Sequence, residues 1–172
     1  SIIFTYPIAL WHNSKLGEIR GNYSFSTLLP MIAVANKDRS VRPEGFDDVK
    51  RFHLEPECQI NFIDKLNLIA NSMIDVSDGL SSEIHHICKE SRVGAVIYEN
   101  KVPILPRVFE AAKLLDECAY TYAYSGGEDF QLLYTISKED STQAIGSEIG
   151  EIVADPQVML SKEGTLIPFL NR

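Results

Sequence analysis

The chain has 172 residues, of which 45% are hydrophobic and 23% are charged, the balance of an ordinary folded domain with a core of useful size. Its formal net charge of -8 disfavours a nucleic-acid-binding protein, because such proteins normally present a basic face to phosphates. The first apolar run, residues 2–10, is interrupted by Thr5 and Pro7 and is too short to span a membrane, and no basic segment precedes it. We therefore expect a cytoplasmic protein that has neither nucleic acid nor a membrane as a partner.

Residues 1–52 are the least regular part of the sequence. One helix-like stretch covers residues 27–36, and residues 39–48 are charged, contain a proline and a glycine, and are typical of a linker. We predict a poorly defined amino-terminal extension, or the remnant of a preceding domain, over residues 1–52. An α/β domain is expected over residues 53–172.

From Cys58 onward, the hydrophobic pattern predicts regular elements. Helices are expected over residues 62–70, 79–90 and 138–146 and, after Pro106, over 108–115. Strands are expected over residues 72–76, 93–99, 120–124, 131–136, 149–154, 157–160 and 165–167. This order of elements predicts a layered α/β or α+β fold, with helices packed on a mixed β-sheet.

The first candidate site lies where a predicted strand turns into a predicted helix. Asp75 and Asp78 are three positions apart and can face one small volume, which suits magnesium because this cation prefers oxygen ligands. Ser77 adds a hydroxyl and an amide beside the helix start, where a phosphate is favoured. Asp78 has helix capping as an alternative role. Asp75 caps nothing obvious, and a carboxylate after a buried strand needs a partner such as a metal.

The second candidate site is the stretch from Ser125 to Phe130. Its paired glycines, Gly126 and Gly127, allow a ligand to approach the backbone closely, and two acidic residues follow them. The alternative is a hairpin-like turn with acidic side chains in solvent.

Other groups of reactive residues are less informative. His85 and His86 are adjacent on a predicted helix and point roughly 100° apart, so a surface or boundary role is expected rather than zinc binding. The three cysteines form no CxxC pair and are expected as reduced thiols. The sequence contains no G-x-x-x-x-G-K-[ST] loop, no H-R-D signature and no G-x-S-x-G elbow.

Taken together, the stretches 72–80 and 125–133 resemble the two signature motifs of thiamine-monophosphate kinases. Between them, residues 91–95 (Ser-Arg-Val-Gly-Ala) and 102–104 (Val-Pro-Ile) resemble the family's run into its next strand and proline. The resemblance covers roughly residues 58–136. Two motifs in this order at a fitting separation are more specific than either motif alone.

The family is related to aminoimidazole-ribonucleotide synthetase, selenophosphate synthetase and the HypE-type proteins. The resemblance implies a fold like the carboxy-terminal α/β domain of aminoimidazole-ribonucleotide synthetase, with residues 1–52 either an extension of it or a remnant of the ATP-binding domain. It also implies that the full-length protein is a homodimer. The implied reaction moves the γ-phosphoryl group of ATP to thiamine monophosphate and gives thiamine diphosphate.

The resemblance assigns roles to individual residues by position. It implies Asp75 and Asp78 as ligands of Mg²⁺, Ser77 as a contact of ATP phosphate, Glu128 as a contact of the thiamine moiety, and Phe169 as an aromatic residue that packs on the substrate.

The chain also departs from the family pattern. The family's amino-terminal domain carries further metal-binding aspartates, and no such domain is recognisable in the sequence. Gly21-Asn22 stands where the resemblance expects a Gly-Asp turn, which would remove one metal ligand. We therefore predict that the isolated chain does not convert substrate. Two alternatives stay open: another ATP-dependent synthetase of the same superfamily, and a catalytically degenerate module that binds nucleotide or phosphate.

Overall fold

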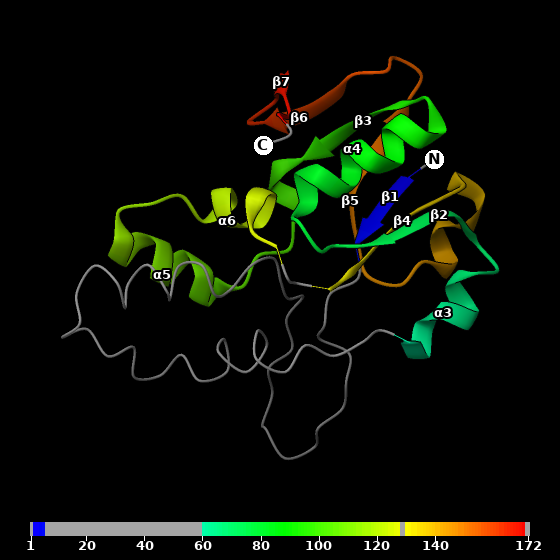
Figure 1. Cartoon of the computed structure of the whole chain (residues 1–172), viewed down its shortest axis with the longest axis horizontal. Coiled ribbons are helices and arrows are strands. Elements are labelled where there is room, and N and C mark those ends of the chain that lie inside the picture. Colours follow the sequence, from blue (N-terminus) through cyan, green and yellow to red (C-terminus); the bar gives the residue numbers. More distant parts are fainter. Residues whose placement is uncertain (1, 6–59, 128–129, 171–172) are drawn as a thin grey trace.

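The computed structural model describes residues 2–5, 60–127 and 130–170, which contribute strands and helices to one seven-stranded sheet and its cover (Figure 1). The strands are β1 (Ile2–Thr5), β2 (Ala70–Asp75), β3 (Gly94–Tyr98), β4 (Leu132–Ile136), β5 (Ser147–Val153), β6 (Val158–Lys162) and β7 (Thr165–Pro168). The α-helices are α3 (Ile60–Leu66), α4 (Leu80–Ser91), α5 (Pro106–Leu115) and α6 (Ala119–Ser125). Two 3₁₀ helices are η2 (Glu99–Lys101) and η3 (Lys138–Gln143).

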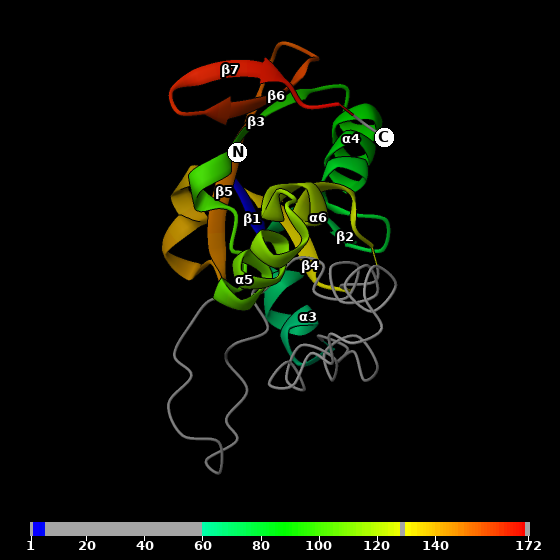
Figure 2. The same cartoon turned by 90° about the vertical axis from the view of Figure 1, so that its left-hand side faces the viewer.

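The sheet is mixed, with the strand order β2-β4-β1-β5-β3-β6-β7. β3 and β6 pair in parallel, and the other neighbours pair antiparallel. Figure 2 shows the β6–β7 hairpin at one end of the sheet, from which the chain continues toward α4. Helices packed on a mixed sheet were expected from the sequence, and this fold class is confirmed.

The main core lies between α4 and one face of the sheet. The sequence places apolar residues of α4 at helical spacing, which buries one side of this helix against the strands. The opposite face is covered by α3 near β2 and β4, because Leu133 belongs to the main core whereas its neighbour Tyr134 packs with Leu66 of α3. Buried residues of the main core include Leu80, Ile84 and Ile87 of α4, Ala95 and Ile97 of β3, Leu133 of β4 and Ile149 of β5.

Most predicted elements are confirmed, and α4 is the clearest case. It was expected over 79–90 and runs over Leu80–Ser91. Arg92 ends it in the left-handed conformation, with its amide directed to the carbonyls of Cys88 and Lys89. The strands after it, and α5, likewise lie within a few residues of their predicted positions, whereas the helix expected over 138–146 is the shorter 3₁₀ helix η3.

Two predictions from periodicity are wrong. Residues 120–124 were expected as a strand but lie in α6, because burial of Ala119, Tyr122 and Ala123 on one helical side outweighs the strand preference of tyrosine and threonine. The helix expected over 62–70 ends at Leu66, and Ala70 already begins β2.

The sequence also gave no indication of β1. This strand comes from residues that we assigned to the amino-terminal extension, yet it pairs with β4 on one side and β5 on the other. Ile3 is fully buried in the main core. The division at residue 52 stays a prediction, but strand residues from before it complete the middle of the sheet. The helix expected over 27–36 and the linker over 39–48 lie outside the described residues.

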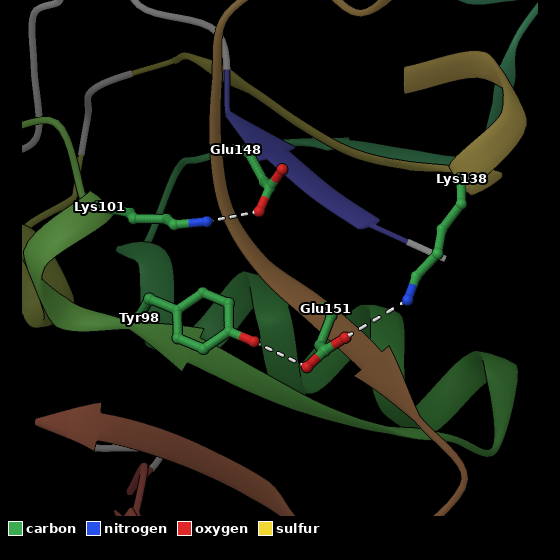
Figure 3. A network of polar contacts seen from close by, with 5 residues as sticks. All are labelled: Tyr98, Lys101, Lys138, Glu148 and Glu151. Atoms are coloured by element: carbon green, nitrogen blue, oxygen red, sulfur yellow. Dashed lines mark hydrogen bonds and ion pairs between the residues drawn. The ribbon is translucent and has the colours of Figure 1, made fainter. Parts of the chain in front are cut away.

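The face of β3 and β5 that points away from α4 carries a polar network (Figure 3). Tyr98 donates a hydrogen bond to Glu151 (2.7 Å), which also lies 3.9 Å from the amino group of Lys138. Lys101 pairs with Glu148 at 2.6 Å. These acidic side chains are partly exposed and paired with lysines, so we read them as surface structure of modest energetic weight.

Two of the three cysteines lie in the described residues. Cys88 and Cys118 are free thiols, and burial raises the pKa of Cys88 to about 11. Cys58 lies outside the described residues. None of the described helices combines the length and the apolar character that crossing a membrane requires.

Replacing Ile84 tests the main core. Ile84 is fully buried between α4 and the sheet, so Ile84→Ala is expected to lower the free energy of unfolding by about 2–5 kcal/mol. Leu68→Ala is the matched control, because Leu68 is 85% exposed and its truncation is expected to change stability by less than about 0.5 kcal/mol. Urea denaturation followed by circular dichroism measures both values, and similar losses for the two variants would contradict this assignment of the core.

Candidate functional site

The two sequence motifs meet at one end of the β2–β4 strand pair. β2 ends at Asp75, directly opposite Leu132, where β4 begins. Beyond these residues the two segments stay paired. The Val76 amide donates to the Gln131 carbonyl at 2.8 Å, and the Phe130 amide donates to the Val76 carbonyl at 2.9 Å. The first motif therefore leaves the sheet toward α4 at the place where the second motif enters it.

Two glycines let the backbones of these motifs touch. Gly79 has a φ of 112°, and a Cβ there would lie 2.7 Å from the carbonyl oxygens of both Tyr124 and Gly126. A Cβ on Gly127 would lie 2.3 Å from the carbonyl oxygen of Ser77. Side-chain carbons do not approach backbone atoms that closely, so glycine is required at both positions. The structure thus brings the two motifs together, as a common pocket would require.

The acidic residues of the first motif lie at this junction. Asp75 and Asp78 are exposed, and Ser77 is half-buried. The alternative role of Asp78 as the helix cap is wrong, because the N-cap residue of α4 is Gly79, which makes no side-chain capping hydrogen bond. Glu128 of the second motif lies outside the described residues.

The donor set at the junction is incomplete by itself. Among the residues that the structure describes, no three His, Cys, Asp or Glu side chains gather closely enough to hold a metal ion. His85 and His86, half-buried and exposed respectively, agree with the expected boundary role. Two aspartates still fit Mg²⁺, which usually binds one or two carboxylates and takes its other oxygens from water and substrate phosphates.

Glu83 is a buried residue at the junction that sequence reasoning missed. Its side chain is 2% exposed and accepts a hydrogen bond from the Asp78 amide at 3.2 Å. It lies in the first turn of α4, where the helix dipole favours a carboxylate. The signal that could have revealed it is an acidic residue shortly after a helix start, as in a capping box.

Phe130 was also missed. Its ring is 39% exposed beside the second motif, and its backbone has a φ of 51°, which is unusual for a bulky residue. The hydrogen bond from its amide to the Val76 carbonyl holds the backbone in this conformation. No feature of the sequence marks a left-handed phenylalanine.

Phe169 lies close to the junction but is part of the core. It is 5% exposed, and its ring meets that of Tyr124 edge-on with 4.8 Å between centroids. The chain is fixed here, since the Phe169 amide donates to the Val158 carbonyl and the Ser81 hydroxyl donates to the Leu170 carbonyl at 2.7 Å. The structure gives Phe169 a packing role, and its contact with a substrate stays a prediction.

Curated relatives match about half of the chain. A thiamine-monophosphate kinase from Buchnera aphidicola (subspecies Schizaphis graminum) is 42% identical over 88 residues, and the one from Aquifex aeolicus is 33% identical over 87 residues. The resemblance to thiamine-monophosphate kinases is confirmed. Each alignment covers 51% of this chain but only 27% and 28% of the respective kinases, so the chain matches about a quarter of their length. No protein-family model matches the chain.

Solved structures extend the similarity in fold to nearly the whole chain. The thiamine monophosphate kinase of Aquifex aeolicus superimposes with a TM-score of 0.72 at 22% identity, covering 96% of this chain and 51% of that one. A structure of AaThiL complexed with AMPPCP and TMP gives a TM-score of 0.71 at 21% identity and covers 96% and 48%. HypE of E. coli is a more distant match, with a TM-score of 0.61 at 17% identity over 84% of this chain and 46% of that one. At such identities these matches establish the fold.

Replacing Gly127 tests the contact between the motifs. Gly127→Ala is expected to lower the free energy of unfolding by about 1–3 kcal/mol, because the new methyl group would overlap the Ser77 carbonyl oxygen. Ser125, two residues earlier, is the exposed last residue of α6, and Ser125→Ala is expected to stay within about 0.5 kcal/mol of the wild type. Urea denaturation compares the two, and a neutral Gly127→Ala would show that the backbones do not touch in solution.

Proposed function

We propose that this chain supplies one half of the site of a thiamine-monophosphate kinase. The reaction forms a bond between a phosphate oxygen of thiamine monophosphate and the γ-phosphorus of ATP, while the bond from that phosphorus to the β,γ-bridging oxygen breaks. The products are thiamine diphosphate and ADP. The observation that carries the proposal is the backbone contact between the two motifs. These motifs resemble the signature motifs of the kinases, and a curated kinase is 42% identical over 88 residues.

The junction suits phosphate groups because its two loops approach each other through glycine backbone, with no side chains between them at these positions. Phosphoryl transfer needs positioning and charge neutralisation rather than a covalent intermediate on the protein. Gly79 and Gly127 keep the two loops close, and Ser77 between them offers a hydroxyl to a phosphate of ATP. We assign the ATP phosphates to this place.

Asp75 and Asp78 are the residues proposed to hold Mg²⁺. Both are exposed, so their charges stay solvated and remain accessible to a cation. When bound, magnesium would neutralise the negative charge of the phosphates, which an acidic chain of net charge -8 would otherwise repel.

Glu128 and Phe169 are proposed for the thiamine side of the site. A carboxylate suits the fixed positive charge of the thiazolium ring, which supports Glu128. Phe169 lies in the core beside Tyr124, so a substrate would reach its ring only after a local change in packing. A cytoplasmic location and a homodimer of the full-length protein remain predictions from the sequence.

Charge-neutral variants of the two aspartates test the cation site. Mg²⁺-dependent binding of AMPPCP, measured by calorimetry, is expected to weaken by about tenfold or more in Asp75→Asn and in Asp78→Asn, because each variant removes one charged oxygen ligand. Asp64→Asn is the matched control, since Asp64 is an exposed residue of α3 and its substitution removes the same charge elsewhere. Equal affinities in all of these proteins would contradict the proposed roles.

Turnover tests how much of the kinase this chain contains. Incubation of the 172-residue chain with ATP, Mg²⁺ and thiamine monophosphate is expected to yield no thiamine diphosphate above a protein-free control. The reason is that the further aspartates of the family's ATP-binding domain are not recognisable in the sequence. Chromatographic detection of thiamine diphosphate would show this expectation to be wrong, and turnover of a different substrate would favour another synthetase of the superfamily.

A further inference from the structure

A buried acidic residue bonds to the helix that precedes the Gly126-Gly127 loop, called the glycine loop below. It has no role in the site described above. Glu99, in η2, is 8% exposed. Its Oε1 atom accepts a hydrogen bond from the Tyr124 hydroxyl at 3.0 Å and lies 3.4 Å from the amino group of Lys162 on β6. A buried carboxylate is costly unless it is paired and hydrogen-bonded, so these contacts fix where its two partners can lie.

Tyr124 connects this buried acid to the junction of the motifs. It lies in the last turn of α6, directly before the glycine loop, and its carbonyl oxygen is one of the two atoms that crowd Gly79. Its ring packs edge-on against Phe169. The hydroxyl, the ring and the backbone of one residue are thus each in contact with a different part of the molecule.

We propose that Tyr124 and Glu99 are positioning residues, whose hydrogen bond fixes the end of α6 and so holds the Gly126-Gly127 loop against Ser77–Gly79 in the arrangement that binds phosphate. This inference rests on the proposed function of the junction. Neither residue touches the ligand, and both act through the backbone that does.

The environment of Tyr124 keeps its hydroxyl a donor. Burial raises the pKa of Tyr124 well above its ordinary value, and the negative charge of Glu99 and the hydrogen bond to it add to this effect. Among the described residues, the groups that face Glu99 are the hydroxyl of Tyr124, the amino group of Lys162 and, at longer range, Tyr120. Burial and Glu99 also raise the pKa of Tyr120. The contact is therefore expected to persist over the whole physiological pH range.

The same helix offers a matched comparison. The Tyr122 hydroxyl also donates to a carboxylate, that of Glu117, but its ring packs with Leu105, Val108 and Ala112 beside α5. Tyr122→Phe and Tyr124→Phe therefore each remove one hydroxyl bonded to a carboxylate from α6. Of the two tyrosines, Tyr124 is the one whose carbonyl oxygen crowds Gly79 of the first motif.

Amide hydrogen exchange in the absence of ligand tests the position of the loops. In Tyr124→Phe the amides of Val76 and Phe130, which pair across the junction, are expected to exchange about tenfold faster, the effect of losing one hydrogen bond to a charged group. The Ala95 amide, bonded to Gln157 between β3 and β6, serves as the remote reference. In Tyr122→Phe the faster amide is expected to be that of Glu117, and the junction is expected to be unchanged.

Binding and a rescue variant separate positioning from general stability. Affinity for AMPPCP with Mg²⁺ is expected to fall about tenfold in Tyr124→Phe and in Glu99→Ala but not in Tyr122→Phe, because a smaller fraction of molecules then has the loops in place. Glu99→Gln keeps an oxygen that can accept the hydrogen bond from the Tyr124 hydroxyl. Its affinity for AMPPCP is therefore expected to stay within about twofold of the wild type. The double variant Tyr124→Phe with Glu99→Ala is expected to lose no more than either single one, because both remove the same interaction.

The outcomes distinguish this inference from the proposed function. Unchanged exchange at Val76 and Phe130 in Tyr124→Phe would overturn the positioning role, even if the wild type binds AMPPCP. Faster exchange with undiminished affinity would overturn it as well, since Tyr124 would then serve stability alone. The wild type could bind no AMPPCP while Tyr124→Phe still accelerates exchange at Val76 and Phe130. That result would support the positioning of the loops by Tyr124 and would overturn the proposed function.

Discussion

The contact between two backbones, at Gly79 and Gly127, is the constraint on which the rest of the site depends. A single methyl group at either position would overlap a carbonyl oxygen of the other motif. The contact brings together the strand-to-helix turn after β2 and the helix-to-strand turn before β4, which are neighbours because those two strands pair. The proposed binding of phosphate and of a cation requires these turns to be adjacent. Strand pairing makes them neighbours, and glycine at both positions allows their backbones to touch.

The acidic residues around this contact fall into a buried pair that stabilises the fold and an exposed pair that is free to bind a ligand. Glu83 and Glu99 are buried and bonded to an amide and a hydroxyl, respectively, so the fold uses them directly. Asp75 and Asp78 are exposed, and within the described part of the chain no cap or core contact requires an aspartate at either position. An exposed carboxylate costs the fold little, and it remains able to bind a cation. The acidic residues most suited to a ligand are therefore those that contribute least to stability.

Much of the fold could be predicted where burial follows a local period. α4 has a regular apolar side, and β4 is a compact apolar run, so their patterns are readable within a few residues. β1 could not be predicted, because its place between β4 and β5 depends on partners far away in the sequence. α6 was misassigned for a related reason: its tyrosines favour strands locally, and only packing against α4 and α5 makes the helix.

The candidate site shows the same division. Its two motifs were readable as residue types, because paired glycines and closely spaced aspartates in this order resemble the signature motifs of one family. The distance between them was not readable, and neither were Glu83, Phe130 or the bond from Tyr124 to Glu99, since each depends on contacts that only the fold creates.

Phe169 shows how the fold limits what a resemblance can imply. A ring that is 5% exposed and packed on Tyr124 belongs to the same buried network that positions the glycine loop. If a substrate used that ring, binding would disturb the packing of Tyr124, and the hydroxyl bonded to Glu99 would resist the change. If Phe169 contacts a substrate as proposed, this contact and the packing of the core would be coupled through Tyr124. Binding on the proposed thiamine side would then change the affinity of the proposed phosphate side through the side chain of Tyr124, without a separate conformational change.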